Sequence, residues 1–224
     1  MTAQLQTRRR LPRMEGFTAR WYAKQRGSQS QLRAYRDQAR DLTGALPDGA
    51  EILEIAPGPG YHTVELARLG RFHVTGVDLS HTFVEIATAY AREQNVEVTF
   101  RQGDAESLPF PDASFDLTVC QAAFKNFGKP VVAIDEMYRV LRPGRTAVIQ
   151  DMSHESTPAD IQAELQRMGI SRLSGIVVGR TLALLRLRAA SEERWRELAS
   201  LSRFGTAEIS RYGITTEVRL TRPA

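Results

Sequence analysis

The chain has 224 residues, of which 42% are hydrophobic and 25% are charged, and it contains one cysteine. This length accommodates one domain with a sizeable core, and the composition is that of an ordinary globular protein. A lone cysteine excludes an intrachain disulfide and a CxxC metal site and suits a reducing compartment. No apolar run approaches the roughly 18 residues of a membrane span, so we expect a cytoplasmic protein with no such span.

The net charge of +4 is concentrated at the N-terminus. Residues 1–13 contain four arginines and no acidic residue, so the remainder of the chain is balanced. This segment has no apolar periodicity, no interleaved aromatic residues and no nucleic-acid motif. We therefore expect residues 1–19 to be a disordered basic tail, residues 20–224 to form a single domain, and nucleic acid not to be a partner.

Predicted helices and strands alternate along the chain. An amphipathic helix at 28–46 lies within an N-terminal lid segment, 20–46. Turn residues mark the helix ends beyond this segment: Gly70 ends one helix, Ser80 suits the start of the next, and Pro130 begins a third. Strands are predicted at 51–56, 72–77, 96–100, 115–121 and 146–150, and helices at 61–69, 81–94 and 130–141.

Five strand–helix alternations predict an α/β fold with a Rossmann-like, doubly wound, mostly parallel sheet and helices on both faces. The core of this sheet spans residues 50–151. The pattern then changes, because residues 156–224 predict helices at 158–169 and 180–200 and a C-terminal antiparallel hairpin at 208–220.

The carboxyl ends of all five predicted strands carry polar residues or glycines, and ligands of open parallel sheets bind at that edge. The first of these turns contains Gly58 and Gly60, which let a ligand approach the backbone closely. A dinucleotide fingerprint requires a further glycine where Thr63 stands, and the phosphate-binding GxxxxGK[ST] pattern is absent. The turn therefore indicates a different nucleotide-like ligand.

Two acidic residues come after the second and third strands. Asp78 can accept hydrogen bonds from both hydroxyls of a ribose or cap the next helix, and Ser80 already suits the capping role. Asp104 can accept a hydrogen bond from an adenine amino group, or it is an ordinary loop residue. The residues alone leave the role of Asp104 open.

Taken together, these motifs resemble those of class I S-adenosylmethionine-dependent methyltransferases, in particular the small-molecule branch similar to the ubiquinone/menaquinone C-methyltransferases. The resemblance covers about residues 50–151 and extends to the leading helix. The motifs that carry it are Leu53–Gly60, Val77–Ser80, Gly103–Glu106, Leu108–Asp112, Ser114–Asp116 and Arg139–Gly144.

The resemblance implies S-adenosylmethionine as the cofactor and S-adenosylhomocysteine as its product. Glu54 would order the turn near the methionine part, Asp78 would bind the ribose, and Asp104 would face the adenine. The sequence departs from the family at Ala56, which is tolerated where φ is negative, and at Arg145, which lies away from the cleft. The implied cofactor-binding residues are Tyr22, Glu54, Ala56, Gly58, Gly60, Asp78, Leu79, Ser80, Asp104, Ala105 and Gln121.

The predicted acceptor pocket is roofed by the N-terminal helix, the loop 122–127 after the fourth strand and the segment after the fifth strand. Phe124 and Phe127 could stack on a flat molecule, and Lys125 and Asn126 could hydrogen-bond it; alternatively, the loop is held by its own side chains. His154, after the fifth strand, is a candidate base and acceptor contact, with Lys125 as a second catalytic candidate. A loop histidine without a role is the competing interpretation.

These observations predict an enzyme that transfers a methyl group to carbon, nitrogen or oxygen of a small organic acceptor by in-line displacement. The acceptor could be hydrophobic or aromatic, as in bacterial secondary metabolism, and a homodimer is a competing use of the apolar C-terminal helices. The alternatives are a cyclase or rearrangement enzyme on the same fold and a non-catalytic binding protein. No metal-ligand spacing is present, and the Asp/Asn-Pro-Pro-Tyr/Phe motif of nucleic-acid amino-methylases is absent.

Overall fold

The computed structural model describes residues 13–168 and 172–224. Residues 1–12 of the predicted tail lie outside this range, but helix α2 already begins at Gly16, within the segment predicted to be disordered. The carboxylate of Glu15 fixes this start, because it accepts hydrogen bonds from the backbone N–H groups of His81 (3.1 Å) and Thr82 (3.0 Å). The prediction of disorder is therefore wrong for the residues from Gly16 onward.

Two helices replace the single N-terminal helix predicted from the sequence. They are α2 (Gly16–Arg26) and α3 (Gln29–Thr43). The break lies at Gly27, after which the Ser28 side chain caps α3 by accepting a hydrogen bond from the backbone N–H of Gln31. The apolar pattern revealed only α3, because α2 exposes large apolar side chains such as Phe17 instead of presenting an apolar face to the core.

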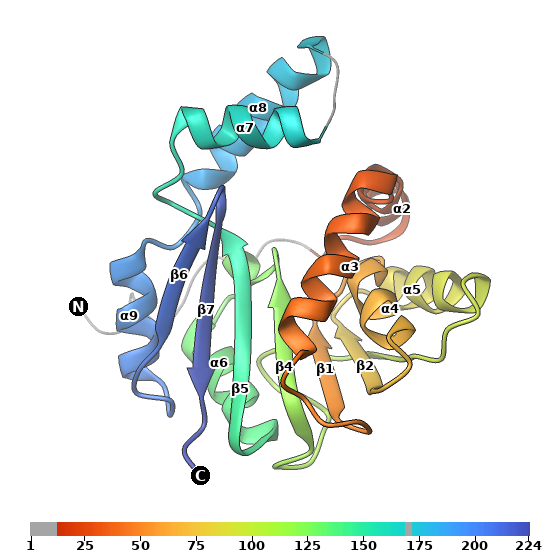
Figure 1. Cartoon of the computed structure of the whole chain (residues 1–224), viewed down its shortest axis with the longest axis vertical. Coiled ribbons are helices and arrows are strands. Elements are labelled where there is room, and N and C mark those ends of the chain that lie inside the picture. Colours follow the sequence, from red (N-terminus) through yellow and green to blue (C-terminus); the bar gives the residue numbers. More distant parts are fainter. Residues whose placement is uncertain (1–12, 169–171) are drawn as a thin grey trace.

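A seven-stranded sheet in the order β3-β2-β1-β4-β5-β7-β6 forms the centre of the molecule (Figure 1). The first five strands are mutually parallel, while β7 is antiparallel to β5 and to β6, which confirms the predicted Rossmann-like sheet and C-terminal hairpin. The strand order reverses between β1 and β4, where such sheets bind ligands. The strands are β1 Glu51–Ile55, β2 His73–Asp78, β3 Thr99–Gln102, β4 Phe115–Gln121, β5 Leu141–Met152, β6 Glu208–Tyr212 and β7 Thr215–Thr221.

Two strands begin elsewhere than predicted. β3 starts at Thr99 because Val96 and Val98 pack against the core before the strand begins to pair. β5 begins at Leu141, and its pairing with β4 shifts register between Phe115 and Leu117. In this irregular stretch, the Arg145 side chain forms an ion pair with Asp116 (3.1 Å). Arg145, the residue that departs from the family pattern, thus has a local partner away from the ligand edge.

Helices cover both faces of the sheet, and two apolar clusters form the core. Alternate strand residues serve opposite faces: Leu53 and Ile55 join the cluster beneath α6 and α9, whereas Ile52 joins the cluster beneath α3 and α4. As predicted, the Ser80 side chain caps α5. These helices are α4 Tyr61–Arg68, α5 His81–Glu93, α6 Pro130–Val140 and α9 Glu192–Leu201, with the short 3-10 turn η1 at Phe124–Asn126.

The segment after β5 contains α7 (Pro158–Arg167) and α8 (Arg172–Arg186), which pair beyond the carboxyl ends of the strands (Figure 1). The predicted helix at 180–200 is wrong, since α8 and α9 are separate and Ser191 caps α9 by accepting from the backbone N–H of Arg194 (3.2 Å). Within the described residues, none of the helices has the length and apolarity needed to span a bilayer.

Candidate active site

The turn after β1 holds two glycines with positive φ angles, Gly58 (57°) and Gly60 (79°). A Cβ atom added to Gly58 would meet no atom within 4 Å, so this residue faces open space. A Cβ on Gly60 would lie 2.7 Å from Ala87 Cβ and 2.8 Å from Phe100 Cζ. A side chain at position 60 would therefore clash with the packing of the domain itself, and the expectation that Gly58 and Gly60 make room for a cofactor remains a prediction.

Ala56 adopts a left-handed conformation with φ 56°. Our expectation that alanine is tolerated here because φ is negative is wrong. A non-glycine residue in this region costs about 1–2 kcal/mol, and such strain persists only where the surroundings enforce it. The Ala56 N–H donates to the Val77 carbonyl oxygen (2.8 Å), which holds the strained residue between the ends of β1 and β2.

Asp78 joins the ends of these two strands. Its carboxylate accepts hydrogen bonds from the backbone N–H of Gly58 (2.9 Å) and from that of Ser80 (2.9 Å). Burial raises the pKa of Asp78, and the two hydrogen bonds only partly oppose that shift. A carboxylate has about four acceptor positions, so two remain for a ligand with paired hydroxyl groups.

Glu54 anchors the start of α4. Its Oε2 accepts a hydrogen bond from the Thr63 hydroxyl (2.7 Å), and its Oε1 lies 3.2 Å from Nδ1 of His62. All three side chains are buried, and neither ring nitrogen of His62 makes a well-formed hydrogen bond in the described part of the chain. The carboxylate thus orders the glycine turn by holding the helix that comes after it.

Sequence reasoning missed a polar pair beside this helix. The guanidinium of Arg26 donates to the Tyr35 hydroxyl (2.7 Å), and the Tyr35 ring packs edge-on against His62 at 6.0 Å. Burial raises the pKa of Tyr35. Among the described residues, no carboxylate lies within 4.0 Å of the Arg26 guanidinium, so this half-buried cation can take an anionic ligand. The sequence could have indicated Arg26 only through its position at the end of α2, and that helix was not predicted.

The predicted lid residue Tyr22 lies on the inner side of α2. It is half-buried, and its ring contacts the ring of Phe83 edge-on at 5.9 Å. The Ser80 hydroxyl donates to the Met14 carbonyl oxygen (2.8 Å), so the chain before α2 is held next to Asp78. The structure therefore brings the N-terminal segment to the predicted ribose site, while contact of Tyr22 with a cofactor remains a prediction.

The turn after β3 is tightly organised. Asp104 Oδ1 accepts a hydrogen bond from the Glu106 N–H (3.0 Å), while the Glu106 carboxylate accepts from the Gly128 N–H (3.0 Å). Ala105 packs partly buried against the core, and Leu79 is also half-buried. Contacts of Asp104, Ala105 and Leu79 with adenine remain predictions.

Gln121, at the end of β4, belongs to a chain of hydrogen bonds across the sheet. Its Nε2 donates to Gln150 Oε1 (2.9 Å), and Gln150 Nε2 donates in turn to Glu217 Oε2 (2.6 Å). Gln38 of α3 also lies 3.4 Å from Gln121 Nε2. This network fixes the amide that we predicted to face the methionine part of a cofactor.

The loop after β4 differs from the predicted acceptor site at two positions. Phe124 is only 2% exposed and packs against Trp195 (ring centroids 4.8 Å apart), so it belongs to the core and cannot stack on an acceptor. Lys125 is held by Asp151, which lies 2.7 Å from its Nζ and also accepts from its backbone N–H (2.9 Å). An ammonium in a buried ion pair is a poor base, so the catalytic role predicted for Lys125 is not supported. The loop is tied down by its own side chains.

The remaining acceptor candidates lie closer to the surface. Asn126 is exposed, and Phe127 is half-buried against the Phe124 ring at 5.2 Å. His154 is exposed just beyond the end of β5. The structure therefore leaves Asn126, Phe127 and His154 available to a ligand, and their roles remain predictions.

The family described as "Methyltransferase domain" matches residues 53–149. Residues 53–149 form a methyltransferase domain. This domain extends from β1 to β5 and contains Glu54, Asp78 and Gln121, whereas α2, α3 and the helices α7–α9 lie outside it.

The methyltransferase domain also has named relatives. A ubiquinone/menaquinone biosynthesis C-methyltransferase of Bdellovibrio bacteriovorus is 30% identical over 146 residues, which is 64% of this chain and 62% of that protein. The structure of the [4+2]-cyclase SpnF is 30% identical, with a TM-score of 0.52 and coverage of 57% of this chain and 47% of that chain. The chain spans 41–62% of the curated relatives that it matches.

One similarity supports the fold of nearly the whole chain. A SAM-dependent methyltransferase from Aquifex aeolicus has a TM-score of 0.66 at 16% identity, covering 91% of this chain and 98% of that chain. At this identity the likeness shows the fold alone. It confirms the Rossmann-like architecture around the methyltransferase domain.

Proposed function

We propose that this chain transfers the methyl group of S-adenosylmethionine to a small organic acceptor. The observation that carries the proposal is the buried Asp78 carboxylate, hydrogen-bonded to the Gly58 N–H at the strand-order reversal of a methyltransferase domain. Burial destabilises the charge of Asp78, and a ligand that donates two hydroxyl hydrogen bonds would restore that lost solvation. The ribose of the cofactor has such hydroxyls.

The residues present fit the rest of this cofactor. The open space at Gly58 admits a ligand against the backbone, and the Arg26 guanidinium can neutralise a carboxylate such as that of the methionine part. When bound, the cofactor supplies a methyl group already activated on a sulfonium. The protein therefore has to position the two reactants and exclude water rather than generate a strong nucleophile.

The acceptor would lie beyond β4 and β5, beside Asn126, Phe127 and His154. Since Lys125 is committed to Asp151, we propose His154 as the group that takes a proton from acceptors that must lose one. The relative from Bdellovibrio is named for quinone biosynthesis, which makes an aromatic, lipophilic acceptor our first choice. Transfer to carbon, nitrogen or oxygen is compatible with this site.

Product mass tests the proposal. The chain is incubated with S-adenosylmethionine and a panel of hydroxyquinol, phenol and amine acceptors. We expect one acceptor to gain one CH₂ group while S-adenosylhomocysteine is released. The 30% identity to a [4+2]-cyclase favours a second candidate, cyclisation on the same fold, and an altered product of unchanged mass would replace the first proposal by this one.

Arg26 gives a separate test of how the cofactor would bind. Loss of a charge-assisted hydrogen bond costs about 1.5–3 kcal/mol, so Arg26→Met should weaken S-adenosylhomocysteine about 10–100-fold. Methylthioadenosine, which has no amino-acid part, should bind the variant and the parent equally. Arg33→Met, at an exposed position of α3, is the matched control. Equal weakening of both ligands would contradict the assignment of Arg26 to the carboxylate.

A further inference from the structure

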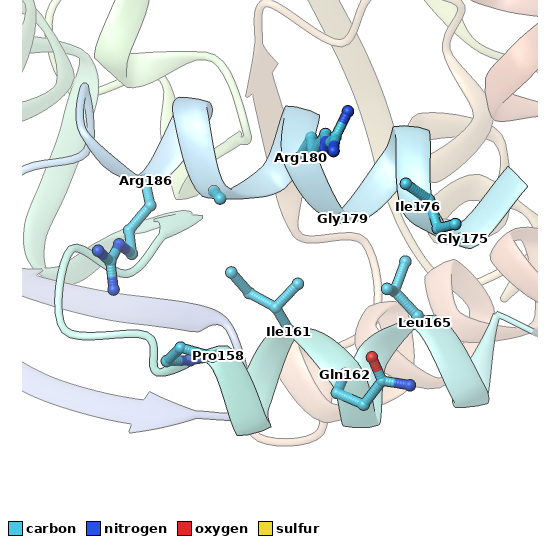
Figure 2. A pocket seen from close by; sticks show the side chains of 10 residues that line it. Pro158, Ile161, Gln162, Leu165, Gly175, Ile176, Gly179, Arg180 and Arg186 are labelled. Carbon is cyan, nitrogen blue, oxygen red and sulfur yellow. The ribbon is translucent and has the colours of Figure 1, made fainter. Parts of the chain in front are cut away.

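Helix α8 exposes an apolar face that no other described element covers. Its large aliphatic side chains are highly exposed: Ile176 (55%), Val177 (66%), Leu184 (66%) and, just past its end, Leu187 (64%). Val177, Leu184 and Leu187 are spaced by seven and three positions, so they share one side of the helix and form a stripe. α8 packs on α7, and Figure 2 shows Ile161 and Leu165 of α7 pointing toward it. Ile176 lines the groove between the two helices with Ile161 and Leu165, whereas the stripe of Val177, Leu184 and Leu187 does not line it.

This apolar stripe is accompanied by positive charge only. Residues 175–191 contain three arginines and no acidic residue. Arg180 is exposed between the aliphatic side chains, and Arg188 is exposed beyond the end of the helix. A helix that combines exposed aliphatic residues with arginines suits an apolar surface bordered by anions.

Helix α2 has the same character at the same end of the molecule. Phe17 (82% exposed) and Trp21 (57% exposed) are four residues apart, next to Arg20 and Lys24, and α2 contains no acidic residue. Figure 1 shows α2 and the α7–α8 pair at the end of the sheet toward which β5 points. Burial lowers the pKa of Arg26, but Tyr35, Tyr22 and Glu164 of α7 together raise it by more, so the end of α2 lies near α7.

We propose that these two faces together bind an anionic lipid bilayer as a peripheral surface, which we name the α2–α8 rim. Tryptophan favours the boundary between water and lipid, the aliphatic side chains reach the acyl region, and the arginines meet the headgroups. A second copy of the chain fits less well, because the arginines of two rims would face each other with no acidic partner. The residues of the rim are Phe17, Trp21, Val177, Leu184 and Leu187.

This inference goes beyond the proposed function and does not depend on it, since lipid binding needs neither cofactor nor acceptor. It has a consequence for access to the site, because the rim lies at the carboxyl ends of the strands (Figure 1). A lipid-dissolved acceptor would reach that edge without crossing water.

Flotation of the full chain with lipid vesicles tests the proposal. We expect the protein to float with vesicles of equal parts phosphatidylglycerol and phosphatidylcholine and to remain below with phosphatidylcholine alone. Raising the salt concentration should weaken the binding, because the headgroup contacts are screened. Failure to float with the anionic vesicles, or equal flotation with both kinds, would overturn the proposal.

Matched variants locate the surface. Leu184→Gln with Leu187→Gln should reduce the bound fraction at least fivefold, while Leu201→Gln, an exposed leucine on α9 (37%), should leave it unchanged. All three positions are exposed, so folding should be preserved. If the double variant instead converts a dimer to a monomer in sedimentation velocity while vesicle binding is unaltered, the face belongs to a second copy and the proposal is wrong.

Fluorescence tests the part of the rim on α2. The chain has two tryptophans, and Trp195 is 2% exposed, so only Trp21 should respond to lipid. We expect a blue shift of the emission on adding anionic vesicles, and no shift in Trp21→Phe. Flotation without a shift in the parent protein would exclude α2 from the membrane surface.

Discussion

The ion pair between Lys125 and Asp151 gives the sharpest test of how the loop after β4 is held. Asp151 is buried, with its side chain 3% exposed, and Lys125 Nζ lies 2.7 Å from its Oδ1. Lys125→Met removes the cation and leaves a buried carboxylate that retains the backbone N–H groups of Lys125 (2.9 Å) and Met152 (2.8 Å). Removing one partner of a buried pair costs about 3–5 kcal/mol, and the remaining donors place this loss near 3 kcal/mol.

Urea unfolding followed by circular dichroism measures this loss. With a slope of about 3 kcal/mol per molar urea, the unfolding midpoint should fall by roughly 1 M. Lys129→Met is the control, because Lys129 is an exposed lysine four positions further along the chain, and it should change the stability by less than about 0.5 kcal/mol. Lys125→Met combined with Asp151→Asn should recover part of the loss, because the buried charge is then removed as well.

The competing interpretation, in which Lys125 is a general base, predicts the opposite pattern. A base contributes about 10²–10⁴-fold to the rate, and its removal would leave the unfolding midpoint unchanged. An unchanged midpoint in Lys125→Met together with a large loss of turnover would therefore refute the structural role. If Lys125 only supports the loop, the folded fraction of the variant should keep the parent's pH–rate profile.

The turn after β1 and the N-terminal segment give three further predictions. Burial raises the pKa of Asp78. Its ionisation therefore lowers the stability of the native state at pH values above the ordinary carboxyl pKa and has no effect below it. The thermal midpoint of Asp78→Asn should therefore rise relative to the parent as the pH increases from about 3 into the neutral range; a difference that is constant with pH would contradict this. Ala56→Gly should stabilise the protein by about 0.5–1 kcal/mol in urea unfolding, because glycine relieves the strain of the left-handed conformation. The control Ala34→Gly, within α3, should destabilise it by about 1 kcal/mol. A loss of stability in both variants would show that Ala56 is unstrained. Hydrogen bonds from Thr82 are the largest cause of the lowered pKa of Glu15, so its carboxylate stabilises the fold above the ordinary pKa and loses that effect as the pH falls through the lowered value. Glu15→Gln should cost about 0.5–1 kcal/mol at neutral pH and progressively less as the pH falls through that lowered value, and should speed tryptic cleavage after α2. A loss that does not change with pH would be evidence against capping by this carboxylate.

Much of the fold could be predicted from the sequence because its signals are local. The alternation of short apolar runs with amphipathic segments indicated the parallel sheet, and Ser80 marked the start of α5 correctly. Helix α2 escaped detection because its exposed Phe17 and Trp21 do not form the buried stripe that periodicity detects. The break before α9 was missed because the apolar residues of α8 merge in sequence with those of the next helix.

The site was harder to predict because it depends on contacts between distant residues. Asp78 and Gly58 were identified from motifs, and the structure joins them by a hydrogen bond. Phe124 was assigned to an acceptor because it comes after a strand, but its burial depends on Trp195, far along the chain. The left-handed φ of Ala56 could not be inferred from the sequence, because alanine rarely adopts this conformation.

Calorimetric titration with S-adenosylhomocysteine tests whether the ends of β1 and β2 bind a nucleoside ligand through Asp78, on which the proposed function depends. We expect the parent chain to bind it and Asp78→Asn to bind it about 10–100-fold more weakly, since asparagine keeps one acceptor oxygen and one hydrogen bond to the buried charge is lost. The variant must remain folded by circular dichroism at the temperature of the titration. Absence of binding heat in the parent at several temperatures, or equal affinity in the two proteins, would contradict the role of Asp78 in cofactor binding.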